Sequence, residues 1–191
     1  MEEKSIIYRF FGHLITITKH KYLVTKYCFK CGLIKQGILH DLSKYSLSEF
    51  IPGVKYFCGD KSPITKEKNL IGYSKAWLHH KGRNKHHWEY WVDRLNKKQE
   101  LTIIEMPFNY VIECVIDKIC ASKVYKGKNY TQKYPYEFFK NSMEINVMNK
   151  KNSKQILKLL KYLKDNGEIK ALQYYKELYI EYKQTNITPT I

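Results

Sequence analysis

Apolar residues recur at helical spacing along most of the chain. Residues 6–33, IIYRFFGHLITITKHKYLVTKYCFKCGL, place Ile6, Phe10 and Ile17 on one side and contain no proline. This pattern predicts one long helix, or two abutting helices. The pair Cys31–Gly32 supplies the glycine that commonly ends a helix.

The middle of the chain is predicted to form shorter helices separated by loops. Ser43 is a candidate cap for a helix that starts within residues 44–50. The pair Pro52–Gly53 and the stretch from Gly59 to Pro63 indicate loops. Residues 64–95 are predicted to form a helix, a turn around Gly82 and another helix.

Three helical patterns follow, in residues 106–125, 153–167 and 168–183, with Pro107 near the start of the first. No internal repeat or Ser/Gly linker divides the chain, whose 191 residues suit one domain. We therefore predict an all-α, single-domain bundle of about six or seven helices, with no sheet beyond an incidental strand pair. Residues 1–185 are expected to form the domain, and residues 186–191 a disordered tail.

The five cysteines are an odd number, and the start MEEKS lacks the basic region of a signal peptide. Free thiols and a cytoplasmic protein are therefore expected. The spacing Cys28-x-x-Cys31 provides half of a zinc site, but no second cysteine pair follows at a suitable distance. No apolar run approaches the roughly 18 residues that span a bilayer, so no membrane partner is expected.

The net charge of +16 favours anionic partners. The lysines are spread along the whole chain, as expected for a generally basic surface. Nucleic-acid binding is compatible with this charge but is not required by it.

The segment SKAWLHHKGRNKHHWEYW, residues 74–91, contains four of the seven histidines. These form two pairs, His79–His80 and His86–His87, seven residues apart, which is two turns and one face if a helix continues through the turn. Another pair, His40–Asp41, joins an imidazole to a carboxylate, and both can bind a divalent ion. The alternative is a purely structural role, in which the histidines stack in the core or belong to an exposed basic turn.

Two carboxylates, Glu113 and Asp117, lie one helical turn apart in the apolar run VIECVIDKICAS. A charged group on a buried helix is expensive unless it is paired or bound to a cation. Asp117 is the better candidate for a metal ligand, because apolar neighbours place it close to the buried stripe.

The order His, His-Asp, His, His, Asp in an all-helical chain resembles the HD phosphohydrolase superfamily. Within it, three segments are similar to an uncharacterised bacterial and phage family of HD-like proteins: TKHKYLVTKYCFKCGLIKQGILHDLSKYSLSEF, GYSKAWLHHKGRNKHHWEYW and MPFNYVIECVIDKICASKVYKGKNYT. The resemblance covers roughly residues 16–160. Some members are labelled catalase, but this sequence contains no haem or manganese-catalase signature.

The resemblance implies an HD-type bundle and an enzyme that hydrolyses phosphoric esters with one or two divalent ions (Mn, Fe, Mg, Co, Ni or Zn). The metal ligands it implies are His20, His40, Asp41, His79, His86 and Asp117, with Asp41 bridging two ions. His80 and His87 are the alternates, because the sequence does not decide which member of each pair points inward.

A small, anionic, phosphorylated substrate such as a nucleotide needs cations beside the metals. The candidates for substrate phosphate are Lys44, Arg83, Asn84 and Lys123, and Lys44 and Arg83 join Asp41 as predicted catalytic residues. Arg83 lies midway between His79 and His86 and can hold a phosphate with two parallel hydrogen bonds. For each of these residues the alternative is a solvated surface position.

Two other functions remain open from the sequence. A histidine-rich site accepts iron, so an HD-like di-iron, oxygen-dependent protein is one. A non-catalytic, metal-stabilised protein that binds nucleotides or nucleic acid is the other. Metal content and phosphate release distinguish these alternatives from a phosphohydrolase.

Overall fold

Helices make up nearly all of the regular structure in the computed structural model, which describes residues 4–59, 61–94 and 100–191. In that part of the chain, ten α-helices and three 3₁₀ helices accompany one two-stranded sheet. This confirms the all-α prediction, although the expected number of six or seven helices was too low, because several of the helices are short. In chain order the elements are α1 (Ile6–Lys30), α2 (Ile34–Leu39), η1 (Leu42–Tyr45), α3 (Leu47–Tyr56), α4 (Pro63–Ile71), α5 (Lys75–Lys81), η2 (Trp88–Trp91), β1 (Val92–Arg94), β2 (Leu101–Ile103), α6 (Phe108–Lys126), η3 (Gly127–Asn129), α7 (Tyr134–Lys140), α8 (Glu144–Val147), α9 (Lys150–Asn166) and α10 (Glu168–Thr185).

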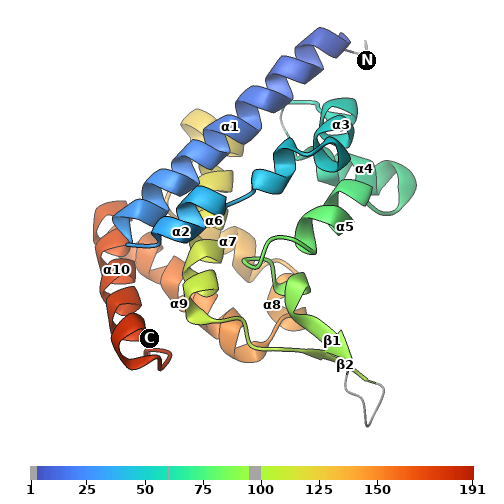
Figure 1. The fold of residues 1–191 in the computed structure, drawn as a ribbon. Coiled ribbons are helices and arrows are strands. Elements are labelled where there is room, and N and C mark those ends of the chain that lie inside the picture. Colours follow the sequence, from blue (N-terminus) through green and yellow to red (C-terminus); the bar gives the residue numbers. More distant parts are fainter. Residues whose placement is uncertain (1–3, 60, 95–99) are drawn as a thin grey trace.

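The predicted long N-terminal helix is present as α1, which crosses the molecule diagonally (Figure 1). Ser5 caps its N-terminus, and the Oγ of Ser5 accepts a hydrogen bond from the backbone N–H of Tyr8 at 3.2 Å. Cys31 caps its C-terminus, and Gly32 then adopts φ +79°, a conformation that glycine allows at little cost. The glycine stop at Cys31–Gly32 is confirmed.

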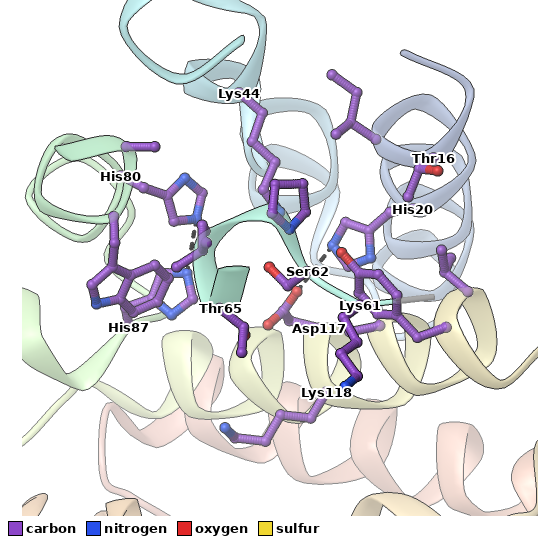
Figure 2. A pocket seen from close by; sticks show the side chains of 18 of the residues that line it. Thr16, His20, Lys44, Lys61, Ser62, Thr65, His80, His87, Asp117 and Lys118 are labelled. Carbon is purple, nitrogen blue, oxygen red and sulfur yellow. Dashed lines mark hydrogen bonds and ion pairs between the residues drawn. The ribbon is translucent and has the colours of Figure 1, made fainter. Parts of the chain in front are cut away.

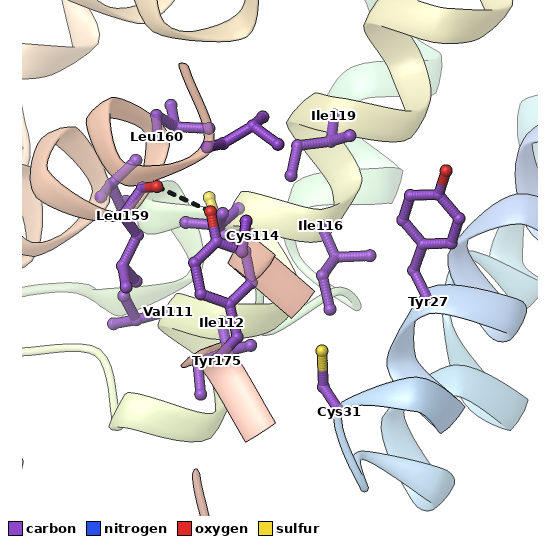
Figure 3. Close-up of a cluster of buried hydrophobic side chains, with 14 of the residues drawn as sticks. Tyr27, Cys31, Val111, Ile112, Cys114, Ile116, Ile119, Leu159, Leu160 and Tyr175 are labelled. Carbon is purple, nitrogen blue, oxygen red and sulfur yellow. Dashed lines mark hydrogen bonds between the residues drawn. The ribbon is translucent and has the colours of Figure 1, made fainter. Parts of the chain in front are cut away.

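The hydrophobic core gathers around α6, which packs against α1, α9 and α10. Figure 3 shows Ile112, Ile116 and Ile119 of α6 facing side chains from these neighbours. The buried hydroxyl of Tyr175 donates to the carbonyl of Leu159 at 2.6 Å, so α10 and α9 are joined by a hydrogen bond inside the core. A helix buried on almost all sides must pair any carboxylate it carries, which applies to Glu113 and Asp117.

Two details of the segment after α2 were predicted wrongly. Ser46, not Ser43, precedes α3, because residues 42–45 first form the 3₁₀ helix η1. The Pro52–Gly53 pair lies inside α3 instead of in a loop. The predicted loop before α4 is present, with Gly59 at φ +96°.

The predicted helices within residues 64–95 differ most from the structure. Gly72, at φ +82°, divides the first helix into α4 and α5. After the turn at Gly82, residues 83–94 form no second α-helix. The chain instead continues through η2 into β1, which pairs antiparallel with β2. The prediction allowed for an incidental strand pair of this kind, and the sheet contains no further strand in the described residues.

The last six residues form no helix or strand, but they contact the rest of the chain. Pro189 is buried, Ile191 packs against the core, and Lys158 Nζ reaches the carbonyl of Ile191. The five cysteines are free thiols, as predicted. In the described ranges, no helix combines the length and hydropathy that crossing a membrane requires.

Candidate metal centre

The centre is organised by His40 and Asp41, which lie at the junction of α2 and η1. Adjacent residues of a helix point in different directions, but here Asp41 adopts a left-handed conformation, φ +53° and ψ +21°. Aspartate tolerates this region better than most residues do. The turn lets both side chains reach the same place between α1, α5 and α6, and both are at most 2% exposed.

The first ligand group consists of His20, His40, Asp41 and Asp117. His20 Nε2 lies 3.0 Å from Asp117 Oδ1, 3.3 Å from His40 Nε2 and 3.5 Å from Asp41 Oδ2. His40 Nε2 is 3.3 Å from Asp41 Oδ2 and 3.5 Å from Asp117 Oδ1. Four ligand atoms from α1, α6 and the α2–η1 junction therefore face one another.

The second ligand group consists of Asp41, His80, His86 and His87. The other oxygen of Asp41, Oδ1, lies 3.2 Å from His80 Nε2 and 3.5 Å from His86 Nε2. His80 Nε2 and His87 Nε2 are 3.0 Å apart. Asp41 thus belongs to both groups and offers a different oxygen to each.

These separations fit divalent ions. Ligand atoms bonded at about 2.1 Å to one ion stand about 3.0 Å apart in octahedral geometry and about 3.4 Å apart in tetrahedral geometry. Asp41 Oδ1 and His86 Nε2 lie 3.5 Å apart, and both are buried without a hydrogen-bond partner among the described residues. A cation between the ligand atoms would satisfy both.

The outer nitrogens of the histidines are held by two buried glutamates. Glu113 Oε1 lies 2.9 Å from His40 Nδ1 and 3.2 Å from His86 Nδ1, so one carboxylate on α6 orients a histidine of each ligand group. Glu49 Oε2 on α3 lies 2.8 Å from His80 Nδ1. Such carboxylates fix which nitrogen faces the metal, because the proton stays on the outer nitrogen. The close set His40, His86 and Glu113 is therefore best interpreted as this outer support.

The electrostatics favour positive charge between the carboxylates. Burial alone would lower the pKa of His40, but the charge of Asp41 and hydrogen bonds to Asp117 raise it well above its usual value. Burial alone would raise the pKa of Asp41, yet His40 and Lys44 hold it well below its usual value. Lys44 Nζ lies 2.6 Å from Asp41 Oδ2.

A pocket of about 600 Å³ opens onto both ligand groups. Figure 2 shows His20 and Asp117 on one side of it and His80 and His87 on the other, with Lys44 at its edge. Much of the remaining wall is apolar or aromatic, from α4, α5, α6 and α7: Pro63, Ile64, Trp77, Ala121, Val124, Tyr134 and Phe138.

The structure brings together five of the six predicted ligands and replaces the sixth. His79 lies outside both groups, because its Nδ1 contacts Glu49 Oε1 at 2.6 Å. Its neighbour His80, named as an alternate, takes the inward position, since consecutive side chains of α5 point in different directions. The alternate His87 joins the second ligand group together with His86, instead of replacing it.

Three of the four predicted phosphate-binding residues do not line the pocket. Arg83 is exposed, and its Nη1 donates to the backbone carbonyl of His79 at 3.3 Å. Asn84 is buried and donates to Ser43 Oγ and to the carbonyl of His80, so it braces the turn between the histidine pairs. Lys123 forms an ion pair with Glu168, on the other side of α6. Lys44 alone of the four lines the pocket.

Sequence reasoning missed the role of Glu49 and gave Glu113 too little weight. For Glu113 the sequence did contain a signal, since a carboxylate within an apolar helix is expected to be paired. Glu49 carried no such signal, because its histidine partners are about thirty residues away along the chain. Lys61 and Lys118 were also missed as cations that line the pocket, and Lys118 is paired there with Glu144 at 2.6 Å.

Comparison with known proteins assigns the chain to a family. Residues 9–165 match a family of unknown function, DUF5662, and since this is most of the chain, the protein belongs to that family. No curated protein and no solved structure matches it. The matched residues include every member of both ligand groups.

Proposed function

We propose that the protein is a metal-dependent phosphohydrolase of the HD type, which hydrolyses a nucleotide or another small phosphoester. The observation that carries the proposal is the division of Asp41 between the two ligand groups, one oxygen to each. A carboxylate in this position suits a pair of ions a few ångströms apart, as in two-metal phosphoesterases. The resemblance of the His, His-Asp, His, His, Asp order to HD phosphohydrolases supports the same reaction.

Bound divalent ions supply Lewis acidity and hydroxide at neutral pH, which is the chemistry that phosphoester hydrolysis needs. The chain's own residues hold and orient these ligands and shape the pocket. Glu113 and Glu49 keep the Nε2 atoms of three histidines directed inward. Lys44 places positive charge at the pocket edge, beside Asp41, where a phosphoryl group's oxygens would approach.

The apolar walls of the pocket serve the same reaction. They lower the local polarity, which strengthens the attraction between Lys44 and an anionic substrate. They also offer surface to the non-reacting part of a substrate.

The test is a metal titration followed by an activity measurement. The purified chain should bind about two equivalents of Mn²⁺ and, once loaded, release inorganic phosphate from at least one member of a panel of nucleotides and phosphomonoesters. Metal binding without release of phosphate from any member would count against the proposed activity while leaving the metal centre in place.

The second ligand group also favours an alternative, a di-iron protein that uses oxygen. Three histidines and one carboxylate form a nitrogen-rich site that accepts iron readily. Iron recovered after purification under reducing conditions, together with an oxygen-dependent colour change and no phosphate release, would support this alternative.

A further inference from the structure

One stripe of α1 faces the pocket along two helical turns. Its members are His13, Thr16, Ile17 and His20, at the i, i+3, i+4 and i+7 positions. A helix rises 1.5 Å per residue, so His13 lies about 10 Å along α1 from the metal ligand His20. The pocket wall therefore extends well beyond the two ligand groups.

His13 is buried but lacks the support that the metal-site histidines have. It is 6% exposed, and its Nδ1 has no hydrogen-bond partner among the described residues. Its ring packs between the rings of Phe50 and Phe57, with centroid distances of 5.3 and 6.1 Å. A Cβ at Gly53 would stand 2.1 Å from its Nε2, so the ring occupies the space that glycine leaves open on α3.

The His13 ring is electrically neutral. Burial, and next the positive charge of Lys44, lower its pKa to about 4. A buried polar atom without a partner costs free energy, and such atoms are rare in folded proteins unless a ligand or water satisfies them. The neutral imidazole suits an uncharged hydrogen-bonding group and does not select for a second phosphate.

We propose that His13 is a specificity-determining residue that forms a hydrogen bond with an uncharged polar group of the substrate, about 10 Å from the reacting phosphorus. This inference rests on the proposed phosphohydrolase function and narrows its substrate class. The substrate is a phosphoester with an extended, uncharged, partly apolar body, of the length of a nucleoside 5′-monophosphate. Short phosphoesters reach the metals but not His13.

The apolar lining between the metals and His13 agrees with this class. Ile17 lies between His13 and His20 on the same stripe, and Pro52 and Gly53 of α3, which packs against His13, also line the pocket. A flat or apolar body fits such walls, and a polar edge at its far end would supply the partner that Nδ1 of His13 lacks among the described residues. Thr16, by contrast, already donates its hydroxyl to the carbonyl of Gly12 at 2.7 Å.

The experiment compares His13→Leu, His13→Asn and the control Thr18→Val in the manganese-loaded protein; Thr18 is an exposed residue of α1 that does not line the pocket. Each is assayed with the four ribonucleoside 5′-monophosphates and with phenyl phosphate, which is too short to reach His13. His13→Leu should lower kcat/KM for the best nucleotide about tenfold or more, the size expected for a lost hydrogen bond, and change that for phenyl phosphate less than twofold. His13→Asn should recover part of the loss, and Thr18→Val should match the unaltered protein.

Several results would overturn the inference. These are a wild-type preference for phenyl phosphate over every nucleotide, an equal loss on short and long substrates, an equal loss in the Leu and Asn variants, or no loss at all. If the wild-type protein hydrolyses none of the substrates, the phosphohydrolase proposal fails and this inference fails with it. Manganese content and melting temperature, measured for each variant, separate a lost contact from a misfolded chain.

Discussion

The two carboxylate oxygens of Asp41 face different histidines, and its backbone has a left-handed conformation. A test of its charge must therefore preserve the backbone. Asparagine adopts the same conformation readily and has nearly the same shape, whereas alanine would add strain to the loss of charge.

We expect Asp41→Asn to abolish the tight binding of both ions, because a neutral amide replaces the carboxylate that they share. Calorimetric titration with Mn²⁺ measures this directly. Asp165→Asn is the control, since Asp165 is an exposed carboxylate paired with Lys161 on α9. An Asp41→Asn variant that still bound two equivalents of Mn²⁺ would be incompatible with a shared ligand.

The neighbours His79 and His80 provide a second test at the residue scale. His80 Nε2 belongs to the second ligand group, whereas the imidazole of His79 contacts Glu49 and belongs to neither group. His80→Ala should remove one of the two equivalents of Mn²⁺ or weaken its binding more than tenfold, and His79→Ala should weaken binding by a few-fold at most. The reverse order of effects in a titration would restore His79 as the ligand.

At the scale of elements, α1 and α3 must stay close for the pocket to keep its shape. Gly12 of α1 lies against Phe57, the residue that ends α3, and a Cβ there would stand 2.3 Å from the ring. Gly82, at the turn after α5, has no atom within 3.4 Å of such a Cβ.

Gly12→Ala should therefore destabilise the protein by about 1–2 kcal/mol, although alanine favours a helix more than glycine does. Gly82→Ala is the matched control and should change stability by less than about 0.5 kcal/mol. Urea denaturation followed by circular dichroism measures both. Equal stability of the two variants would mean that Phe57 moves aside without penalty.

The positions of several helices could be predicted from the sequence. Periodicity and the glycine at position 32 located α1, and the apolar runs located α6, α9 and α10. The seven-residue spacing of His80 and His87 would place both on one face if a helix continued through Gly82, but here a turn braced by Asn84 brings their Nε2 atoms to 3.0 Å. Spacing cannot distinguish these cases, because both bring the two rings to the same side.

The choice between His79 and His80 could not be made from the sequence either, because it depends on the rotation of α5 against α3. Glu49 sets that rotation by holding both histidines, and its place in the fold is a long-range contact without a local signal. Arg83 was misplaced for a related reason: its position between the histidine pairs is exposed, on the outside of the turn.

At the scale of the whole molecule, the core encloses four of the five thiols. Burial raises the pKa of Cys31 and of Cys114 to about 12, and it also raises those of Cys28 and Cys120 well above the usual value. Cys58 alone is partly exposed. A raised pKa leaves little reactive thiolate at pH 8.

We expect one thiol per folded chain to react quickly with Ellman's reagent at pH 8, and five after unfolding in guanidinium chloride. Cys58→Ser should remove the fast reaction. Rapid reaction of several thiols in the folded protein would show that the core around α6 opens more readily than its packing indicates.

The central claim is that Asp41 joins two metal positions inside one helical domain. Anomalous diffraction from crystals grown with Mn²⁺ tests it most directly, because it locates the ions without any assumption about activity. We expect two peaks about 3.5–4 Å apart, one among His20, His40, Asp41 and Asp117, the other among Asp41, His80, His86 and His87. Crystals of the manganese-saturated protein with no peak in either ligand group, or with ions only at surface carboxylates, would contradict the account.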